Sequence, residues 1–381
     1  MPHPDLIVVG AGIVGAACAA EASAAGLSVE VLDSGFAGGG TTAAAMGHVV
    51  VMDDSEAQLA LTALSRRLWT ELASELPASC EDERTGTLWI AADEDEIELV
   101  RRKAAVHRAR GIAVEELDAA ALRDAEPRLR EGLAGALRVP DDRVVYPPNA
   151  ARWLLERAEA RGAVRREHER VASIGERRVE TASGTRHAGA VVNAAGPAAA
   201  ALTPRLPVAP RKGHLVITDR YPGFCRHQLV ELGYLKSAHG RSSESVAFNL
   251  QPRRTGQMLL GSSREFVGMD ASINRPLRAR MIRRAVEYAP ALSRLSAIRT
   301  WVGFRPATPD NLPLVGRWDE VPGLWIAAGH EGLGVTTSLG TARLLVDALL
   351  GRTSEIDPSP YSPQRAFPPD PMRAFAPGGH V

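Results

Sequence analysis

The sequence has little cysteine and no net charge, and each lack excludes a class of protein. Its 381 residues contain three cysteines, Cys18, Cys80 and Cys225, which share no metal-binding or redox spacing. We therefore expect a reducing compartment, no structural disulfide and no metal site. Lysine plus arginine balances aspartate plus glutamate at 45 each, which argues against binding to nucleic acid or to an anionic membrane.

The sequence also lacks a long uncharged apolar run, so it contains no candidate for a membrane-spanning helix. The apolar N-terminus has no basic leader, and its glycines are spaced for a turn rather than for a signal peptide. We expect a soluble, cytoplasmic protein whose partner is a small molecule, and homo-oligomerisation stays open. The length exceeds that of one hydrophobic core, which predicts two domains.

A glycine-rich turn follows the first apolar run. Residues 6–15 read Leu-Ile-Val-Val-Gly-Ala-Gly-Ile-Val-Gly, and a second apolar run ends at Asp33. The pattern predicts a strand, a helix and a second, parallel strand. Gly10 would make the tight turn, Gly12 would let a pyrophosphate approach the backbone, and Gly15 would let helix and strand pack closely. Asp33 is placed to accept hydrogen bonds from ribose hydroxyls, so the unit predicts a dinucleotide and leaves NAD and FAD open.

A second run of small residues, 35–48, lies where a dinucleotide would continue. Small residues permit the close approach of a flat ring system, and Thr41 or Thr42 can cap a helix and donate to a phosphate. The alternative is a flexible loop. A further small-residue turn, 193–197, follows an apolar strand, and such a turn is where an open α/β sheet receives its ligand.

The rest of the chain predicts a mixture of helices and short strands. The segment 210–299 is typical of a mostly antiparallel sheet, and the proline-rich tail beyond 356 predicts disorder or an extended strap. Helices are expected over 55–76, 95–110, 150–161, 276–288 and 337–350, and strands over 87–92, 190–193, 215–218, 245–250, 258–262 and 325–329.

Two late stretches resemble a known family. Residues 301–316 read WVGFRPATPDNLPLVG and residues 329–338 read GHEGLGVTTS. Together with the first glycine turn and the turn at 193–197, they resemble the D-amino-acid oxidase superfamily of FAD enzymes, which includes glycine oxidase, sarcosine oxidase and D-amino-acid dehydrogenases. Within it, residues 47–54 and 86–89 look most like D-hydroxyproline dehydrogenases.

The resemblance implies an α/β fold with a discontinuous FAD-binding, Rossmann-like (GR2-type) domain over 1–85, 140–210 and 300–365. A substrate domain on a mostly antiparallel or mixed sheet would take 86–139 and 211–299, and 366–381 would be a tail. The FAD would be noncovalent, because no cysteine stands near Arg305. The implied cofactor-binding residues are Gly10, Gly12, Ile13, Val14, Gly15, Asp33, Ser34, Thr41, Thr42, Ala43, Met46, Gly47, His48, Val171, Ala195, Gly196, Gly213, Arg305, Gly332, Leu333, Gly334, Val335 and Thr336.

The resemblance also implies that Arg305 binds the substrate carboxylate, and a guanidinium suits that two-pronged contact. The alternative is a structural salt bridge to Asp310. Further substrate-binding candidates are Tyr234, His48 and Glu331, with Glu265 as a weaker one. His48, and His330 of the motif 329–338, could equally be buried histidines whose ring nitrogens have hydrogen-bond partners. No catalytic acid or base is implied, since the α-carbon would pass a hydride to the flavin.

The expected activity is FAD-dependent oxidation of a D-amino or imino acid to its imine, with cis-4-hydroxy-D-proline as the implied substrate. Glycine or sarcosine oxidation is one alternative, and a role as the FAD subunit of a multi-subunit dehydrogenase is another. A third, an NAD-binding regulatory module, predicts a colourless protein. The electron acceptor, whether oxygen, a quinone or a partner protein, stays open.

Overall fold

The structure is a computed structural model that describes residues 3–233 and 244–367. Its contacts divide the chain into two compact units, which comprise 1–80, 146–211 and 304–381 in the first and 81–145 and 212–303 in the second. Tyr234, a substrate-binding candidate, lies outside the described residues. Among the residues that are described, no helix has both the length and the apolar character needed to cross a bilayer.

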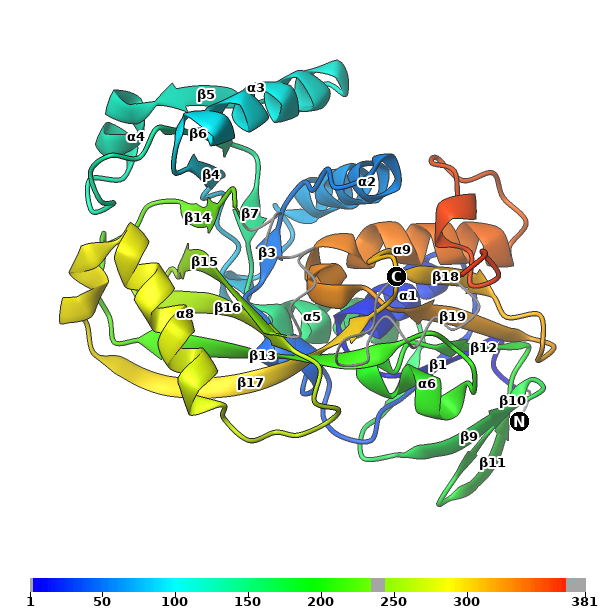
Figure 1. Ribbon diagram of the computed structural model, residues 1–381. Coiled ribbons are helices and arrows are strands. Elements are labelled where there is room, and N and C mark those ends of the chain that lie inside the picture. Colours follow the sequence, from blue (N-terminus) through cyan, green and yellow to red (C-terminus); the bar gives the residue numbers. More distant parts are fainter. Residues whose placement is uncertain (1–2, 234–243, 368–381) are drawn as a thin grey trace. The chain divides into compact units, whose positions relative to one another are not determined.

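The first unit is built on a six-stranded sheet in the order β18-β19-β12-β1-β2-β8 (Figure 1). Its strands are parallel except β18, which runs antiparallel to β19. The strands are β1 (Leu6–Val9), β2 (Val29–Leu32), β8 (Val164–Arg166), β12 (Ala190–Asn193), β18 (Leu314–Arg317) and β19 (Leu324–Ala328). The helices and short turns are α1 (Ile13–Ala24), η1 (Thr41–Ala44), α2 (Glu56–Leu72), η2 (Ala78–Cys80), α5 (Pro147–Glu159), η3 (Gly196–Ala198), α6 (Ala199–Leu202), η5 (Glu331–Leu333), α9 (Gly334–Leu349) and η6 (Ser359–Tyr361).

Two different layers cover this sheet. Helices α1, α5 and α9 pack together, with α2 against α9 (Figure 1). A small antiparallel sheet packs against the six-stranded sheet through a buried apolar cluster. The cluster contains Ile7 and Val191 of the large sheet and Val171 and Val179 of the small one. It consists of β9 (Val171–Gly175), β10 (Arg178–Thr181) and β11 (Gly184–His187). The two-residue strand β3 (His48–Val49) precedes α2.

The second unit is an eight-stranded sheet in the order β17-β13-β16-β15-β14-β4-β6-β5. The pairs β13–β16, β16–β15, β15–β14, β4–β6 and β6–β5 are antiparallel, and β14 runs parallel to β4. The strands are β4 (Thr87–Ala91), β5 (Glu115–Asp118), β6 (Gly135–Val139), β13 (Ala209–Thr218), β14 (Gln228–Glu231), β15 (Glu244–Pro252), β16 (Met258–Glu265) and β17 (Ala297–Ala307), with the short β7 (Arg143–Val144) before the chain returns to the first unit. The helices are α3 (Glu94–Ala109), α4 (Ala119–Ala125), α8 (Arg275–Tyr288) and the short η4 (Pro290–Arg294).

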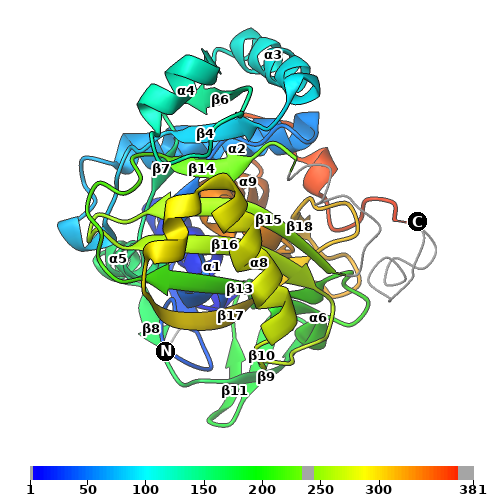
Figure 2. The same ribbon diagram turned by 60° about the vertical axis from the view of Figure 1, so that its left-hand side comes forward.

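One face of that sheet is covered by α8, which lies across β16 and β15 (Figure 2). Met281 of α8 and Leu122 of α4 belong to the same buried cluster as Phe248. Tyr288 stacks on the ring of Phe248 with 4.7 Å between centroids. A parallel sheet covered by helices and a separate mixed sheet together confirm the expected α/β class.

Several expected elements are found with small shifts, and five boundaries differ by three residues or more, namely the starts of α5, α9 and β13 and the ends of α2 and β16. Helix α5 begins at Pro147 instead of residue 150, because Pro147 and Pro148 fit the first helical turn, where no N–H partner is needed. Helix α9 begins at Gly334 instead of residue 337, so the glycine motif lies in its first turn. The tail is a strap up to residue 367, where Arg365 binds the carboxylate of Asp310 and Tyr361 is buried.

Candidate functional site

The turn after β1 leaves no room for side chains at two of its glycines. Gly10 has a φ of +110°, and a Cβ there would lie 2.5 Å from the carbonyl oxygen of Ala194. A Cβ on Gly15 would lie 1.9 Å from the carbonyl oxygen of Gly10. The first geometry demands a glycine for backbone conformation and the second for close packing of α1 on the turn.

The N-terminus of α1 is capped by Thr42, which lies well beyond the helix in the sequence. The hydroxyl oxygen of Thr42 accepts a hydrogen bond from the backbone N–H of Ile13 at 3.0 Å. A Cβ on Gly12 would lie 3.2 Å from that same oxygen and meet nothing else within 4 Å. Thr42 therefore caps α1 from the small-residue run, while Gly12 keeps open the space beside the helix end.

Asp33 holds the same turn from the end of β2. One of its carboxylate oxygens accepts from the N–H of Ala11 at 2.6 Å, and the other accepts from the N–H of Gly35 at 2.7 Å. Each carboxylate oxygen has a second acceptor position, so these bonds leave capacity for ribose hydroxyls. Asp33 thus ties both glycine-rich segments to the end of β2.

The two glycine motifs, more than 300 residues apart, meet at the start of α9. A Cβ on Gly334 would lie 3.9 Å from a methyl carbon of Val14, in the first turn of α1. Thr336 donates its hydroxyl to the carbonyl oxygen of His48 at 2.9 Å, and Trp69 donates to the carbonyl oxygen of Val335 at 3.1 Å. Two helix N-termini, each a positive dipole end whose first N–H groups have no acceptor within the helix, therefore lie next to each other.

This arrangement fits a dinucleotide with a flat ring system. The glycine cradle beside α1 and the N-terminus of α9 offer N–H groups for phosphates and ring carbonyls, and Asp33 offers acceptors for ribose. Gly196, in the turn after β12, has a φ of +56°, and a Cβ there would meet nothing within 4 Å. The open space at Gly12 and Gly196 is what a bound group would fill.

The other predicted cofactor residues fall into two sets. In the first unit, Thr41 donates to the carbonyl oxygen of Phe304 at 2.7 Å. Ser34 and Ala43 are exposed, Met46, Gly47 and Val171 are buried, and Ala195 and Leu333 are half-buried. Gly213 belongs to the second unit.

Arg305 lies in a cluster of charged side chains in the first unit. Arg305 and Glu331 were predicted as site residues from the sequence, whereas Arg211 was not. Its Nε would lie 3.5 Å from a Cβ built on Gly332, so its side chain runs along the turn η5. The neighbouring Glu331 forms an ion pair with Arg211, with 3.1 Å between Oε1 and Nε. Asp310, the alternative partner expected for Arg305, is instead bound by Arg365 through both of its oxygens.

Arg211 was missed, although the sequence carries a signal for it. Arg211 and Lys212 are consecutive cations in a largely buried strand, shortly before its apolar run 215–217, and buried cations need partners. Lys212 has them in the second unit, where its ammonium lies 3.2 Å from both Glu265 and Asp270. Glu265, the weaker substrate candidate, is therefore held in a buried ion pair.

His330 is a buried histidine with a satisfied partner. Its Nε2 lies 3.0 Å from the hydroxyl of Thr341, and burial lowers its pKa from 6.5 to about 3. The ring is neutral at any working pH, so it supplies no charge at the start of α9. Of the two readings left open for His330, the buried structural one fits this environment.

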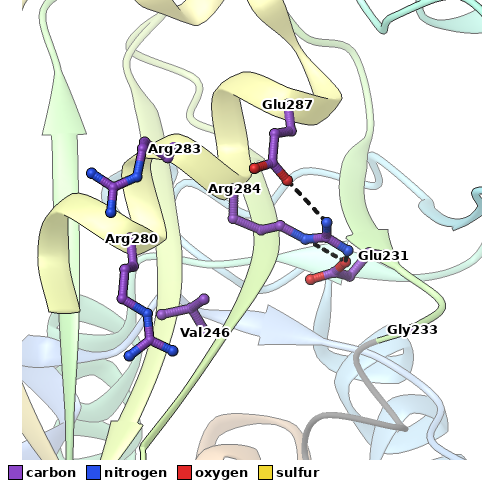
Figure 3. A pocket seen from close by; sticks show the side chains of 7 residues that line it. All are labelled: Glu231, Gly233, Val246, Arg280, Arg283, Arg284 and Glu287. Carbon is purple, nitrogen blue, oxygen red and sulfur yellow. Dashed lines mark hydrogen bonds and ion pairs between the residues drawn. The ribbon is translucent and has the colours of Figure 1, made fainter.

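The second unit has a hollow beside α8, which none of the predicted site residues lines (Figure 3). Figure 3 shows Arg284 pointing toward Glu231 and Glu287, and both ion pairs form. Arg280 pairs with Glu244. Among residues 3–233 and 244–367, no group of three or more histidine, cysteine, aspartate or glutamate side chains could hold a metal ion.

Comparison with known proteins gives one consistent answer. The model of the family DAO, described as FAD dependent oxidoreductase, matches residues 5–348. The hydrogen cyanide synthase subunit HcnC of Pseudomonas aeruginosa is 29% identical over 96% of this chain and 97% of its own. A D-amino acid dehydrogenase of Cereibacter sphaeroides is 31% identical over 81% of this chain and 71% of its own. The glycine oxidase structure from Geobacillus kaustophilus superposes with a TM-score of 0.86 at 28% identity, covering 97% of this chain and all of that one.

Proposed function

The chain belongs to the DAO family of FAD-dependent oxidoreductases, and from that premise we propose that it oxidises glycine, sarcosine or another small amino or imino acid to the imine. FAD, when bound, supplies the acceptor for the hydride that leaves the α-carbon of the substrate. The names glycine oxidase and D-amino acid dehydrogenase, carried by several relatives, both describe the oxidation of an amino acid. The choice of substrate is the step that needs a test.

One observation carries this proposal: Arg305 lies beside the turn that leads into α9. Its side chain runs along Gly332, two residues before Gly334, and Gly334 adjoins Val14 at the start of α1. A guanidinium that binds a carboxylate in two prongs would therefore hold an amino acid next to the dinucleotide cradle. The residues proposed to hold FAD are the glycines of the α1 turn, Asp33, Thr42 and the first turn of α9.

The described residues of this cradle provide orientation rather than proton transfer. His330 stays neutral, and its Nε2 is engaged by Thr341. We propose that the amine arrives unprotonated, and that Arg305 fixes the α-carbon by holding the carboxylate. The positive end of α9 would stabilise negative charge that develops on the ring system bound there.

A narrower substrate, cis-4-hydroxy-D-proline, rests on the resemblance of residues 47–54 and 86–89 alone. Two of the relatives named above act, by their names, on glycine or on D-amino acids, and this favours the broader proposal. Noncovalent binding of FAD is also proposed, because the described cysteines are all buried and Cys18 and Cys80, those of the first unit, lie in α1 and η2.

The proposal is tested by anaerobic titration of the purified protein with glycine, sarcosine, D-proline and cis-4-hydroxy-D-proline. We expect the flavin absorbance to bleach with at least one of them, and the pattern to name the substrate. Arg305→Ala should keep FAD and raise the apparent KM by about 10- to 100-fold, the loss expected for a charged hydrogen-bonded contact. A flavin that no amino acid reduces, or an unchanged KM in the variant, would contradict the proposal.

A second candidate is a catalytic subunit that needs partner chains. It is favoured by the match to HcnC, a named subunit that is 29% identical over nearly the whole of both chains. Such a subunit would be bleached by its substrate but reoxidised slowly in air, and a small quinone or dye would restore turnover. Fast reoxidation by oxygen alone would make the chain an oxidase.

A further inference from the structure

One face of the sheet in the second unit is apolar, and α8 covers it (Figure 2). Leu88 of β4, Leu229 of β14 and Leu250 of β15 point to this face, since all three belong to the buried cluster that includes residues of α8. Neighbouring residues of a strand point to opposite faces of a sheet. The residues that alternate with these leucines therefore form the other face of three adjacent strands.

That other face carries buried polar side chains. Thr87 of β4 lies beside Gln228 of β14, and Asn249 of β15 lies beside Val230, two residues further along β14. Thr87, Gln228 and Asn249 are 0%, 2% and 7% exposed. On its other side, Asn249 is paired with Gly261 of β16, which has no side chain to contact it. We call Thr87, Gln228 and Asn249 the polar face.

Each side chain of the polar face has a buried oxygen atom with no hydrogen-bond partner within residues 3–233 and 244–367. These atoms are Oγ1 of Thr87, Oε1 of Gln228 and Oδ1 of Asn249. By contrast, the buried ring of His214 in the same unit is bonded at both of its nitrogens. Because buried polar atoms are normally paired, three such oxygens on one face indicate a ligand or an ordered water as their partner.

The chemistry of the polar face favours a neutral ligand group that donates hydrogen bonds. Amide oxygens only accept, so a carboxylate, which also only accepts, would leave them unpaired. Three neutral side chains offer no countercharge to a buried ion. A hydroxyl group carries no charge, donates to one amide oxygen and can accept from a neighbouring amide or hydroxyl group. An apolar group would leave all three oxygens unpaired, and that penalty makes such a site selective.

We propose that the polar face binds the side chain of the substrate, and that the substrate is an amino or imino acid whose side chain or ring carries a hydroxyl group. This inference rests on the proposed function and narrows its substrate class, since glycine and sarcosine have no such group. Thr87, Gln228 and Asn249 determine specificity, and none of them is assigned a step in the oxidation.

The test compares pairs of substrates that differ by one hydroxyl group. D-serine with D-alanine is one pair, and cis-4-hydroxy-D-proline with D-proline is the other. Anaerobic flavin reduction, followed over a range of substrate concentrations, gives a second-order rate constant for each compound. In the wild type we expect the hydroxylated member of at least one pair to be favoured by about tenfold or more.

Asn249→Leu and Gln228→Met replace an amide by an apolar group of similar size. Each should lower the preference for the hydroxylated substrate by at least about threefold, and the double variant should abolish it. The Tm of the ligand-free protein should not fall, because an unpaired buried amide has been removed. Thr87→Val tests the polar face independently if neither amide variant folds. Glu231→Gln, on the α8 side of β14, is the matched control and should keep the wild-type preference.

The remaining outcomes separate this inference from the proposed function. A preference that survives in every variant overturns the role of the polar face, and a lower Tm in those variants would identify bound water as the partner of its oxygens. Equal reduction by both members of each pair also overturns the inference, while the proposed function stands because the substrates are oxidised. A flavin that none of these compounds, glycine or sarcosine reduces overturns both.

Discussion

The carboxylate of Asp33 accepts a hydrogen bond from the backbone N–H of Ala11, with 2.6 Å between the two heavy atoms. This bond ties the end of β2 to the glycine turn after β1, and the other oxygen ties it to Gly35. The shape of the cradle and the acceptors for ribose therefore depend on the same side chain.

The first prediction follows from this double role. Asp33→Ala should lower FAD affinity by about 10- to 100-fold, because it removes both a charged acceptor and the bonds that order the turn. Asp33→Asn retains one good acceptor oxygen, so its FAD affinity should lie between those of the wild type and Asp33→Ala. Fluorescence titration of the apoprotein with FAD gives the dissociation constants. Wild-type affinity in the alanine variant would show that Asp33 neither orders the turn nor reaches the ribose.

A second prediction concerns two glycines of that turn. Gly15→Ala places a methyl group 1.9 Å from a backbone oxygen, so it should destabilise the protein by at least about 4 kcal/mol. Gly12→Ala places a methyl group 3.2 Å from the hydroxyl of Thr42, which must shift and weaken its cap on α1, so the apoprotein should lose about 0.5 to 2 kcal/mol. Its methyl group should also fill space that FAD needs.

Thermal unfolding of both variants, with and without FAD, distinguishes these effects. Gly12→Ala should lower the apoprotein Tm by clearly less than Gly15→Ala does, and FAD should add little stability to it. Equal destabilisation of the two apoproteins would contradict the different environments of these glycines.

The third prediction is a pH dependence of stability from His330. The unfolded chain protonates this ring near pH 6.5, whereas the folded protein keeps it neutral down to about pH 3. The unfolded state therefore binds more protons in between, and the contribution of His330, complete above pH 6.5, is lost as the pH falls. The loss amounts to about 1.4 kcal/mol per pH unit.

Urea unfolding at several values between pH 6.5 and 5 measures this slope. His330→Asn has no titrating ring, so its unfolding free energy should fall less steeply than that of the wild type. Parallel slopes would mean that the folded protein protonates His330 in this range.

The fourth prediction concerns Glu231 in the second unit. Its carboxylate is 3% exposed, accepts from the N–H of Phe248 at 2.6 Å and binds Arg284, whose pKa rises through this pairing although burial opposes it. Glu231→Ala should cost about 3 kcal/mol, because it leaves a buried N–H and a half-buried guanidinium without their partner. Glu231→Gln should cost less, since its amide oxygen can still accept.

The exposed pair of Arg317 and Asp319 provides the matched control. Both side chains are more than 60% exposed, so Asp319→Ala should change the unfolding free energy by less than about 1 kcal/mol. Urea denaturation compares the variants directly. Similar costs at the two sites would refute the importance of the Glu231 network.

Local signals made much of the fold predictable. Ser55, Asp93 and Asn274 accept hydrogen bonds from N–H groups three residues on, and each marks the start of a helix close to where it was expected. The strands at 87–91 and 190–193 were also identified, because each contains a short apolar run, 88–91 and 190–192, which the structure buries. Such features depend on neighbours along the chain.

The arrangement of side chains over long distances could not be predicted in the same way. Thr42 caps a helix that begins 29 residues earlier, and Arg211 meets Glu331 across 120 positions. Periodicity and capping patterns carry no information about such partners. The start of α9 was wrong for a related reason: Gly334 and the turn before it are poor helix formers, and the helix begins there within a packed environment. The roles of the individual site residues remain predictions.

The meeting of Val14 and Gly334 has a consequence for how the protein is made. The first residue lies in the first turn of α1 and the second in the first turn of α9, so the ribosome makes the two sides of the cradle more than 300 residues apart. An N-terminal fragment that ends before α9 lacks the helix that completes the site. We therefore expect FAD to be held in its final form only after α9 has been synthesised.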